Sequence, residues 1–396
     1  MTKTTSRRAK SSGGVSVRTT STGLVRYEAR VSLTHPETGN RRQVGKTFVN
    51  RADAQRWLTA QLASVDKGTF TEDHRLTVEA WLSRWLAAKD QQLRPATRLS
   101  YRSLLQQHVI PRLGGKRLAE LKPSHLSDAY SAIVADSVTS GRSKIGPATV
   151  QRINAVLRSA LSDAMQDGYV SRNVASLVRL PKVPKPQSSW WEVSHVRAFT
   201  EHTRGDRHQA LWLLLLRCGL RRGEALGLRW EDVTLETDDG TWPHARIARQ
   251  VLAVGGQILR GEPKTDAGVR VVVLDPATIA ALKSWSKVQA AERLVAGPAW
   301  GGDPEIFTNS VGRVTDPSWV TKRFRTLLRE AGLPLIRLHD ARHTAASQWL
   351  AAGVPLKDVS GLLGHSSLSI TADTYGHVLD DSRQAAARAM AARLEA

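Results

Sequence analysis

Cysteine is nearly absent from this chain of 396 residues, which contains a single one, Cys218. One cysteine excludes an intrachain disulfide framework and any metal site built from clustered cysteines. Acidic residues are also scarce, with 36 Asp and Glu against 57 Lys and Arg, so the formal net charge is +21. Such an excess does not define a fold, but it predicts an anionic partner.

Long apolar runs are missing as well. The longest strongly apolar run, ALWLLLL at residues 210–216, ends at Arg217 and is far shorter than the roughly 20 residues that cross a bilayer. Residues 1–14 are basic but lack the apolar segment of a signal peptide, so we expect a disordered basic arm. No convincing basic amphipathic helix favours an anionic membrane surface. These absences predict a cytoplasmic protein with no membrane partner.

The positive charge is concentrated in the first part of the chain. Residues 1–70 contain 13 basic and 4 acidic residues, a net charge of +9. Residues 71–187 contain 18 and 9, again +9, whereas the remainder contains 26 and 23, or +3. Because each phosphate contact releases counterions, this distribution predicts nucleic-acid binding that weakens steeply with salt.

Turn signals and hydrophobic spacing divide the chain into three parts. In residues 15–68, three alternating stretches predict a small three-stranded sheet, and the helical spacing that follows predicts a helix packed against it. Residues 75–180 predict several helices separated by Pro and Gly. Three prolines within residues 181–189, at positions 181, 184 and 186, predict an extended linker.

The last part, residues 190–396, mixes predicted helices with a β region in ARIARQVLAV and VRVVVL. Its Ala-rich end has high helix propensity but only a thin apolar stripe, so we expect it to pack on another surface. The predicted fold class is therefore multidomain α+β. It combines a small sheet with one helix, an all-helical domain, and a mainly helical domain with a small sheet.

Two short motifs open the set of candidate site residues. In CGLRRGEALGLRW, Arg221 follows Gly219, a helix-stop signal, and precedes Glu224 by three residues. Alone, this pair is more typical of a solvated surface ion pair. In EPKTDAGVRVVVL, Lys264 stands at a predicted turn before a strand, where most lysines are simply solvated.

Two further motifs lie near the C-terminus. In RLHDARHT, His339 and Arg342 share one face of a predicted helix at i and i+3. A lone histidine at such a position is more often structural. In GLLGHSSLSITADTYGH, His365 follows a helix end and Tyr375 comes ten residues later. An isolated tyrosine in this place is usually a packing residue.

Taken together, the four motifs resemble the tyrosine recombinase family, of the phage-integrase type. The stretches GLRRGEALGLRW, HDARHTAA, LLGHSS and TYGH match that family closely. The residues that match its catalytic set are, in order, Arg221, Lys264, His339, Arg342, His365 and Tyr375. The resemblance covers the whole chain, and it implies an arm-type DNA-binding domain at 15–68, a core-binding domain at 75–180 and a catalytic domain at 190–396.

The resemblance also implies a mechanism. Tyr375 would attack the scissile phosphate, form a covalent 3′-phosphotyrosyl link and release a 5′-hydroxyl. Arg221 and Arg342 would bind the phosphate, because a planar guanidinium donates two parallel hydrogen bonds to its oxygens. His339 would accept the tyrosine proton and Lys264 would protonate the leaving oxygen.

Two more roles follow from the same resemblance. His365 would donate a further hydrogen bond to the phosphate, and Glu224 would orient the first arginine of the set. No cofactor or metal ion is implied, because the covalent intermediate stores the energy of the broken bond.

The implied protein is a site-specific integrase of a bacterial mobile element, either a phage or an integrative plasmid, associated with the nucleoid. Its implied partners are double-stranded DNA, at core and arm attachment sites, and three further copies in a homotetramer on DNA. An excisionase and a DNA-bending host factor are candidate accessory partners. A type IB topoisomerase-like enzyme and a catalytically inactive DNA-binding regulator remain as alternatives. A metal-dependent nuclease has weak support, since the acidic pairs at 238–239 and 380–381 do not obviously converge.

Overall fold

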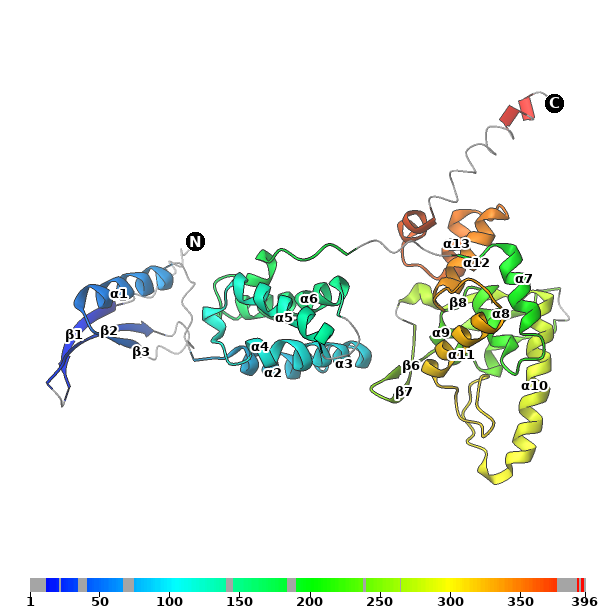
Figure 1. The fold of residues 1–396 in the computed structure, drawn as a ribbon, viewed down its shortest axis with the longest axis horizontal. Coiled ribbons are helices and arrows are strands. Elements are labelled where there is room, and N and C mark those ends of the chain that lie inside the picture. The colour runs from blue at the N-terminus through cyan, green and yellow to red at the C-terminus, as the bar shows by residue number, and fades with distance from the viewer. Residues whose placement is uncertain are drawn as a thin grey trace, which may run out of the picture. The chain divides into compact units, whose positions relative to one another are not determined.

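The computed structural model describes residues 12–20, 23–34, 41–66, 75–139, 145–183, 190–237, 240–263, 265–375, 390–391 and 393–394. The chain divides into two compact units, residues 1–184 and residues 185–396, which Figure 1 colours from blue to green and from green to red. Small sheets accompany helices in both units, as the predicted α+β class requires. No helix in these ranges has the length and apolarity needed to cross a membrane.

The first unit begins with the predicted sheet and helix. Their bounds are β1 Ser12–Thr19, β2 Val25–Thr34, β3 Arg41–Phe48 and α1 Arg51–Asp66. The strands are antiparallel in the order β1-β2-β3, and α1 packs against one face. Ala29 and Val31 of β2 meet Ala54 and Leu58 of α1 in a small core. Alternation along β2 places its apolar residues toward the helix and its charged residues on the opposite face.

β1 begins earlier than the sequence indicated. The strand includes residues 12–14, which we expected in the basic arm, while residues 1–11 lie outside the described ranges. The reason is a close approach at Gly13, where a Cβ atom would lie 2.5 Å from Leu58 Cδ1 and 2.8 Å from the Arg30 carbonyl oxygen. Glycine therefore extends the strand under the helix rather than ending it.

The remainder of the first unit, residues 75–183, is helical as predicted and is called here the helical region. Its α-helices are α2 Val78–Lys89, α3 Pro95–Leu104, α4 Ile110–Leu113, α5 Pro123–Thr139 and α6 Pro147–Gln166. Two buried indoles join α2 to α6. Trp81 donates from Nε1 to the Ala160 carbonyl at 3.0 Å, and Trp85 donates to Asp163 at 2.7 Å.

Pro111 does not end the helix that precedes it. α3 continues through a π-helical turn, Leu105–Val109, into α4. The Ile110 N–H bonds to the Leu105 carbonyl, five residues back. Pro111 has no N–H to donate, and the wider turn lets the chain pass it without breaking the helical course.

The described residues of the second unit form seven named α-helices, a further helical segment at residues 368–375 and two small sheets. The helices are α7 Val193–His202, α8 Gln209–Leu216, α9 Arg222–Gly227, α10 Pro276–Ala296, α11 Pro317–Glu330, α12 Asp340–Ala351 and α13 Leu356–Leu363. The strands are β4 Val233–Thr234, β5 His244–Ile247, β6 Gln250–Val254, β7 Gln257–Gly261 and β8 Arg270–Val273. β4, β5 and β8 form one antiparallel sheet in the order β4-β5-β8, and β6 pairs with β7 in a hairpin.

α8 is the centre of this unit, because seven of its eight residues are buried. A helix that is apolar all round must be covered on every side, and α7, α9, α10 and α12 contact it. Residues 181–183 of the predicted linker have no regular structure, and its remainder lies outside the described residues. Of the Ala-rich end, the described Met390 and Leu394 are exposed, so its predicted packing stays a prediction.

Candidate functional site

The motif residues converge on one cavity of about 430 Å³ in the second unit. The N-terminal end of α9, the start of α12, the loop before β8 and the segment after α13 all reach it, and Figure 1 shows α12 and α13 beside each other. Its described lining residues are Arg221, Glu224, Gln250, Pro263, Thr265, Gly268, His339, Arg342, His343, Gly364, His365, Ser366, Ile370 and Tyr375. Glu224 is the one carboxylate among them.

Arg221 is placed by the end of α8. Gly219 adopts φ +63°, which ends the helix, and Arg221 is then the N-cap of α9. Its Nη1 donates to Glu224 Oε1 at 2.6 Å, and its Nη2 donates to the Gly364 carbonyl at 3.5 Å. The side chain is 40% exposed, so part of the guanidinium remains open to the cavity.

Glu224 is not a surface residue, since its side chain is 2% exposed. It accepts hydrogen bonds from the Arg221 backbone N–H at 2.9 Å and from Arg270 Nη2 at 2.8 Å, besides the Arg221 side chain. Burial raises its pKa, but the Arg270 and Arg221 partners outweigh burial, so the pKa lies below its ordinary value. Glu224 is therefore a charged carboxylate that holds the Arg221 side chain in place.

Arg270 was missed by the sequence analysis. Its side chain is 6% exposed, and its Nε donates to the Leu362 carbonyl at 2.6 Å, which joins β8 to the end of α13. The signal was available in VRVVVL, because Arg270 and Val272 lie two residues apart on one strand and share a face. Val272 is buried, and an arginine on the buried face of a strand needs a partner.

Arg342 is the most buried arginine of the set, with 3% exposure. Its Nη1 donates to the Gly219 carbonyl at 2.9 Å, and its Nη2 donates to the Leu363 carbonyl. Burial and the nearby Arg221 charge lower its pKa to about 9, although Glu224 opposes the shift. Its positive charge is thus held in place by carbonyl dipoles rather than by an acid of its own.

Positive charge therefore exceeds negative charge at this cavity, because Arg221 and Arg342 line it and Glu224, which also bonds to Arg270, is the one carboxylate among the described lining residues. An excess of positive charge in a partly buried site destabilises the folded protein unless a bound anion neutralises it. A phosphate diester fits this requirement, because it offers oxygens to two guanidinium groups at once.

His365 reaches the cavity because α13 ends abruptly. Gly364 adopts φ +63°, and a Cβ atom there would lie 2.7 Å from the Ala267 carbonyl oxygen. The Nδ1 atom of His365 lies 2.9 Å from Thr371 Oγ1, which fixes the ring. Burial and the charges of Arg342 and Arg221 lower its pKa to about 4, so the imidazole is neutral at pH 7. Nε2 then remains to face an anion.

Tyr375 is 2% exposed and lies in a helical segment whose described part is residues 368–375. Its hydroxyl is 2.7 Å from the Nδ1 atom of His343, a residue that the sequence analysis did not assign to the site. Burial raises the pKa of Tyr375 to about 12, although the Arg342 charge acts in the opposite sense. His339 lines the same cavity, with its ring edge-to-face to that of His343 at 5.2 Å.

Lys264 lies outside the described residues. Its neighbours in sequence, Pro263 and Thr265, both line the cavity. The role predicted for Lys264 therefore stays a prediction. Across the described ranges, no three His, Cys, Asp or Glu side chains come together as metal ligands.

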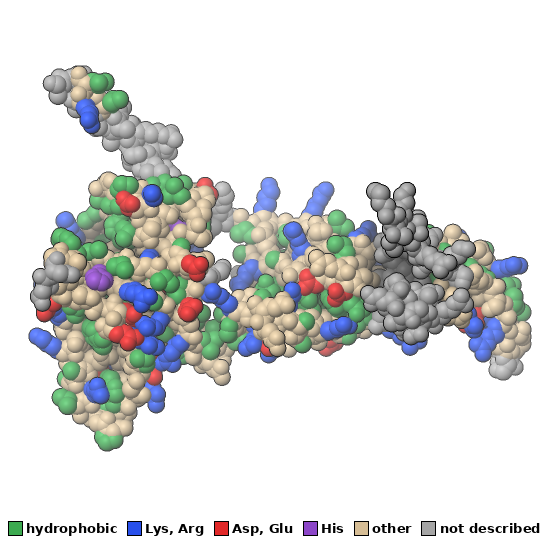
Figure 2. Space-filling model, turned by 180° about the vertical axis from the view of Figure 1, so that it is seen from behind, with side chains coloured by type: hydrophobic (Ala, Val, Ile, Leu, Met, Phe, Trp, Pro, Cys, Tyr) green, Lys and Arg blue, Asp and Glu red, His purple; other side chains and the backbone are tan. Residues whose placement is uncertain are grey.

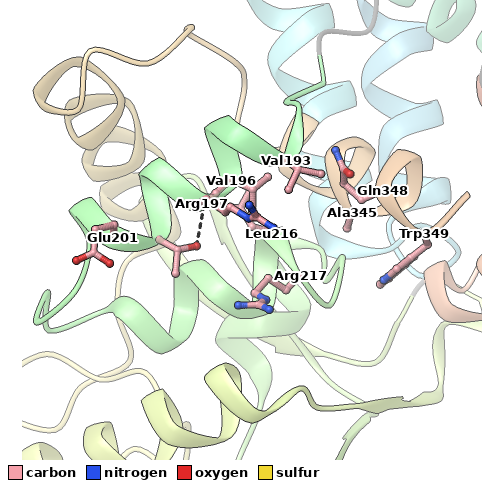
Figure 3. A pocket seen from close by; sticks show the side chains of 10 residues that line it. Val193, Val196, Arg197, Glu201, Leu216, Arg217, Ala345, Gln348 and Trp349 are labelled. Atoms are coloured by element: carbon pink, nitrogen blue, oxygen red, sulfur yellow. Dashed lines mark hydrogen bonds between the residues drawn. The ribbon is translucent and has the colours of Figure 1, made fainter. Parts of the chain in front are cut away.

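A second cavity of about 530 Å³ lies between α7, α8 and α12 of the same unit. Figure 3 shows its side chains, with Val193 and Val196 on one wall and Ala345, Gln348 and Trp349 on the other. The described residues that line it include neither histidine nor tyrosine.

Comparison with known proteins agrees with this geometry. The Phage integrase family matches residues 192–382, and the phage integrase N-terminal SAM-like domain matches residues 77–133. The chain belongs to the tyrosine recombinase family. The family activity is cleavage and rejoining of DNA strands, so this tyrosine recombinase is an enzyme of site-specific recombination.

Known proteins are similar to this recombinase over most of its length. It is 27% identical over 369 residues to a tyrosine recombinase XerC-like protein from Caldanaerobacter subterraneus subsp. tengcongensis, covering 88% of this chain and 92% of the relative. The Tn1549 transposon integrase in complex with transposon right end DNA has a TM-score of 0.65 at 21% identity, covering 81% of this chain and 100% of that one. A lambda integrase tetramer bound to a Holliday junction has a TM-score of 0.51 at 14% identity, covering 89% and 95%. The two structural likenesses show a shared fold.

Proposed function

We propose that this recombinase integrates a bacterial mobile element, a phage or an integrative plasmid, with Tyr375 as its nucleophile. The observation that carries the proposal is the convergence of Tyr375, Arg221, Arg342 and His365 on one cavity with an excess of positive charge. The phenolic oxygen attacks phosphorus, the 3′ end becomes linked to the tyrosine, and the 5′ oxygen leaves.

The arginines serve the transition state. Charge grows on the non-bridging oxygens as phosphorus becomes five-coordinate, and Arg221 and Arg342 are already oriented to meet it by Glu224 and by backbone carbonyls. His365 donates from Nε2 to the same phosphate. Lys264 protonates the leaving 5′ oxygen, in keeping with the place of its sequence neighbours beside the cavity.

The helical region would bind the core attachment site. Its surface carries many Lys and Arg side chains, several of which project from the face that Figure 2 shows. Residues 71–187 as a whole have a net charge of +9. The N-terminal sheet would bind the arm sites, because Arg18 and Arg26 lie opposite each other on the face away from α1. A narrow antiparallel ribbon of this kind fits the DNA major groove.

Strand exchange requires cleavage at two sites in two duplexes, so the working assembly on DNA would be a homotetramer. The lambda integrase that shares this fold forms a tetramer on a Holliday junction. The Ala-rich end after Tyr375 would link neighbouring copies, and an excisionase and a DNA-bending host factor would set the direction of the reaction. The protein would act on the nucleoid, in the cytoplasm of its host.

A nicked duplex that carries the element's attachment site tests the central claim. It is incubated in EDTA with the wild type and with Tyr375→Phe, and the products are separated on a denaturing protein gel. We expect a covalently DNA-linked band for the wild type alone. A band with both proteins would show that another residue is the nucleophile, and tight binding without a band would favour the DNA-binding regulator.

A further inference from the structure

Among the described residues, His343 is the hydrogen-bond partner of the Tyr375 hydroxyl. The Nδ1 atom of His343 and the Oη atom of Tyr375 are 2.7 Å apart, and their rings are tilted at a centroid distance of 5.6 Å. The contact joins α12 to the segment that follows α13. It therefore depends on the fold, since 32 residues separate the two partners.

We propose that His343 is a catalytic residue that accepts the phenolic proton of Tyr375 as the tyrosine attacks the phosphate. The inference rests on the proposed role of Tyr375 as nucleophile. As the Oη–P bond forms, the O–H bond breaks and its proton moves to the lone pair on His343 Nδ1. The P–O5′ bond breaks with its electron pair on the 5′ oxygen, which takes its own proton from Lys264.

A base is needed at this place because Tyr375 rarely ionises by itself. Burial raises its pKa to about 12, so at pH 7 the phenol is almost entirely protonated. A proton acceptor within hydrogen-bond distance removes this barrier during the attack. His343 is at that distance before any substrate is bound.

The surroundings of His343 favour the neutral, accepting form. Burial lowers its pKa below the ordinary value, Arg337 and Arg342 act in the same sense, and Asp340 opposes them. The rings of His339 and Tyr375 are its aromatic neighbours. Once the proton has arrived, the Asp340 carboxylate, which is 3% exposed and held by Arg337, stabilises the imidazolium.

His339 has a different position. Besides the catalytic cavity, it lines a neighbouring one of about 410 Å³ together with Arg221, Arg222 and Thr321. It therefore lies on the arginine side of His343, where a phosphate oxygen would be bound. We assign His339 to a hydrogen bond with the phosphate rather than to the proton of the tyrosine.

His343→Asn tests the proposal, because an amide group reaches the place of Nδ1 and keeps a hydrogen bond but cannot take a proton. The substrate is the nicked attachment-site duplex with sulfur in place of the leaving 5′ oxygen, so that protonation of the leaving group no longer matters. Formation of the covalent adduct is followed in single turnovers between pH 6 and pH 8, below the pKa of about 9 of Arg342, so that its charge stays constant. His339→Asn is the matched control.

For His343→Asn we expect adduct formation about 100-fold slower than wild type at pH 7, the contribution of a general base. Hydroxide replaces the base as pH rises. The ratio of the wild-type rate to the His343→Asn rate should therefore fall by up to about tenfold per pH unit. The wild-type rate should be nearly flat, since His343 is already neutral. His339→Asn should keep a constant deficit across this range.

Several results would overturn the proposal. His343→Asn could match the wild type, it could show a deficit independent of pH, or the pH-dependent deficit could belong to His339→Asn. Absence of an adduct with the wild type would instead contradict the proposed nucleophile. Should His343→Asn fail to fold, nitrogen NMR of ¹⁵N-histidine-labelled wild type and Tyr375→Phe decides the matter. We expect His343 with its proton on Nε2, and a proton on Nδ1 would refute its role as acceptor.

Discussion

Two arginine clusters in the second unit differ in how their charge is balanced. Arg260 of β7 donates from Nε to Glu305 at 2.7 Å and from Nη2 at 3.0 Å, and Asp303 lies 3.1 Å away. The hydrogen bonds that Arg260 donates to Glu305 and the two carboxylate charges raise the pKa of Arg260. Arg313 also lies near Asp303, with Nη1 3.7 Å from Oδ1, so two guanidinium groups are matched by two carboxylates and the charge balances without a ligand.

The arginine cluster at the proposed catalytic cavity has the opposite charge balance. Arg221 and Arg270 both bond to the single carboxylate of Glu224, whereas Arg342 bonds to backbone carbonyls, and its pKa falls to about 9. A structural cluster satisfies its charges within the fold, whereas a site for an anion leaves part of the positive charge unsatisfied. The difference separates two groups of arginines that look alike in the sequence.

The largest expected difference between the two arginine clusters is in the rate of DNA cleavage when an arginine is replaced. Arg342→Lys should slow formation of the covalent adduct by about 100- to 1,000-fold, the loss typical of one transition-state donor. A lysine is a point charge and cannot bond to two carbonyls and a phosphate in one plane. The rate is measured on the nicked attachment-site duplex.

Arg260→Lys is the matched control for that experiment. Its cluster has no part in the proposed chemistry, so adduct formation should stay within about twofold of wild type. Equal losses for the two variants would show that charge balance does not distinguish the catalytic cluster.

A smaller effect is expected on the free energy of unfolding, and here the Arg260 variant should lose more than the Arg342 variant. Arg260→Met leaves Glu305, which is 2% exposed, without its partner and should lower the free energy of unfolding by about 1–3 kcal/mol. Arg342→Met should cost less, because it also removes one of three crowded positive charges. Urea denaturation of both variants measures the difference, and a larger loss for Arg342→Met would contradict the interpretation.

Local patterns were sufficient for much of this architecture and for part of the site. The stop at Gly219 predicted the place of Arg221, and helical spacing predicted that His339 and Arg342 share a face. The sequence could not show that Arg270 reaches the end of α13, nor that the segment ending in Tyr375 folds back onto His343. These contacts depend on how β8, α12 and α13 pack. Burial of Glu224, which turned a typical surface pair into part of the site, has the same tertiary origin.

The smallest expected effect is stabilisation of the fold by inorganic phosphate. Phosphate would neutralise the cluster that contains Arg342 and leave the cluster of Arg260 unchanged. At ten times its dissociation constant, phosphate should stabilise the wild type by about 1.4 kcal/mol, since it binds the folded chain alone. Arg260→Met should keep this gain, because its lost partners lie outside the catalytic cavity. Arg342→Met should lose most of this stabilisation.

Thermal unfolding measured in phosphate, and in sodium chloride at equal ionic strength, separates phosphate binding from general screening. Equal gains for both variants would place the anion elsewhere on this basic protein, and the catalytic arginines would then need DNA itself to balance them.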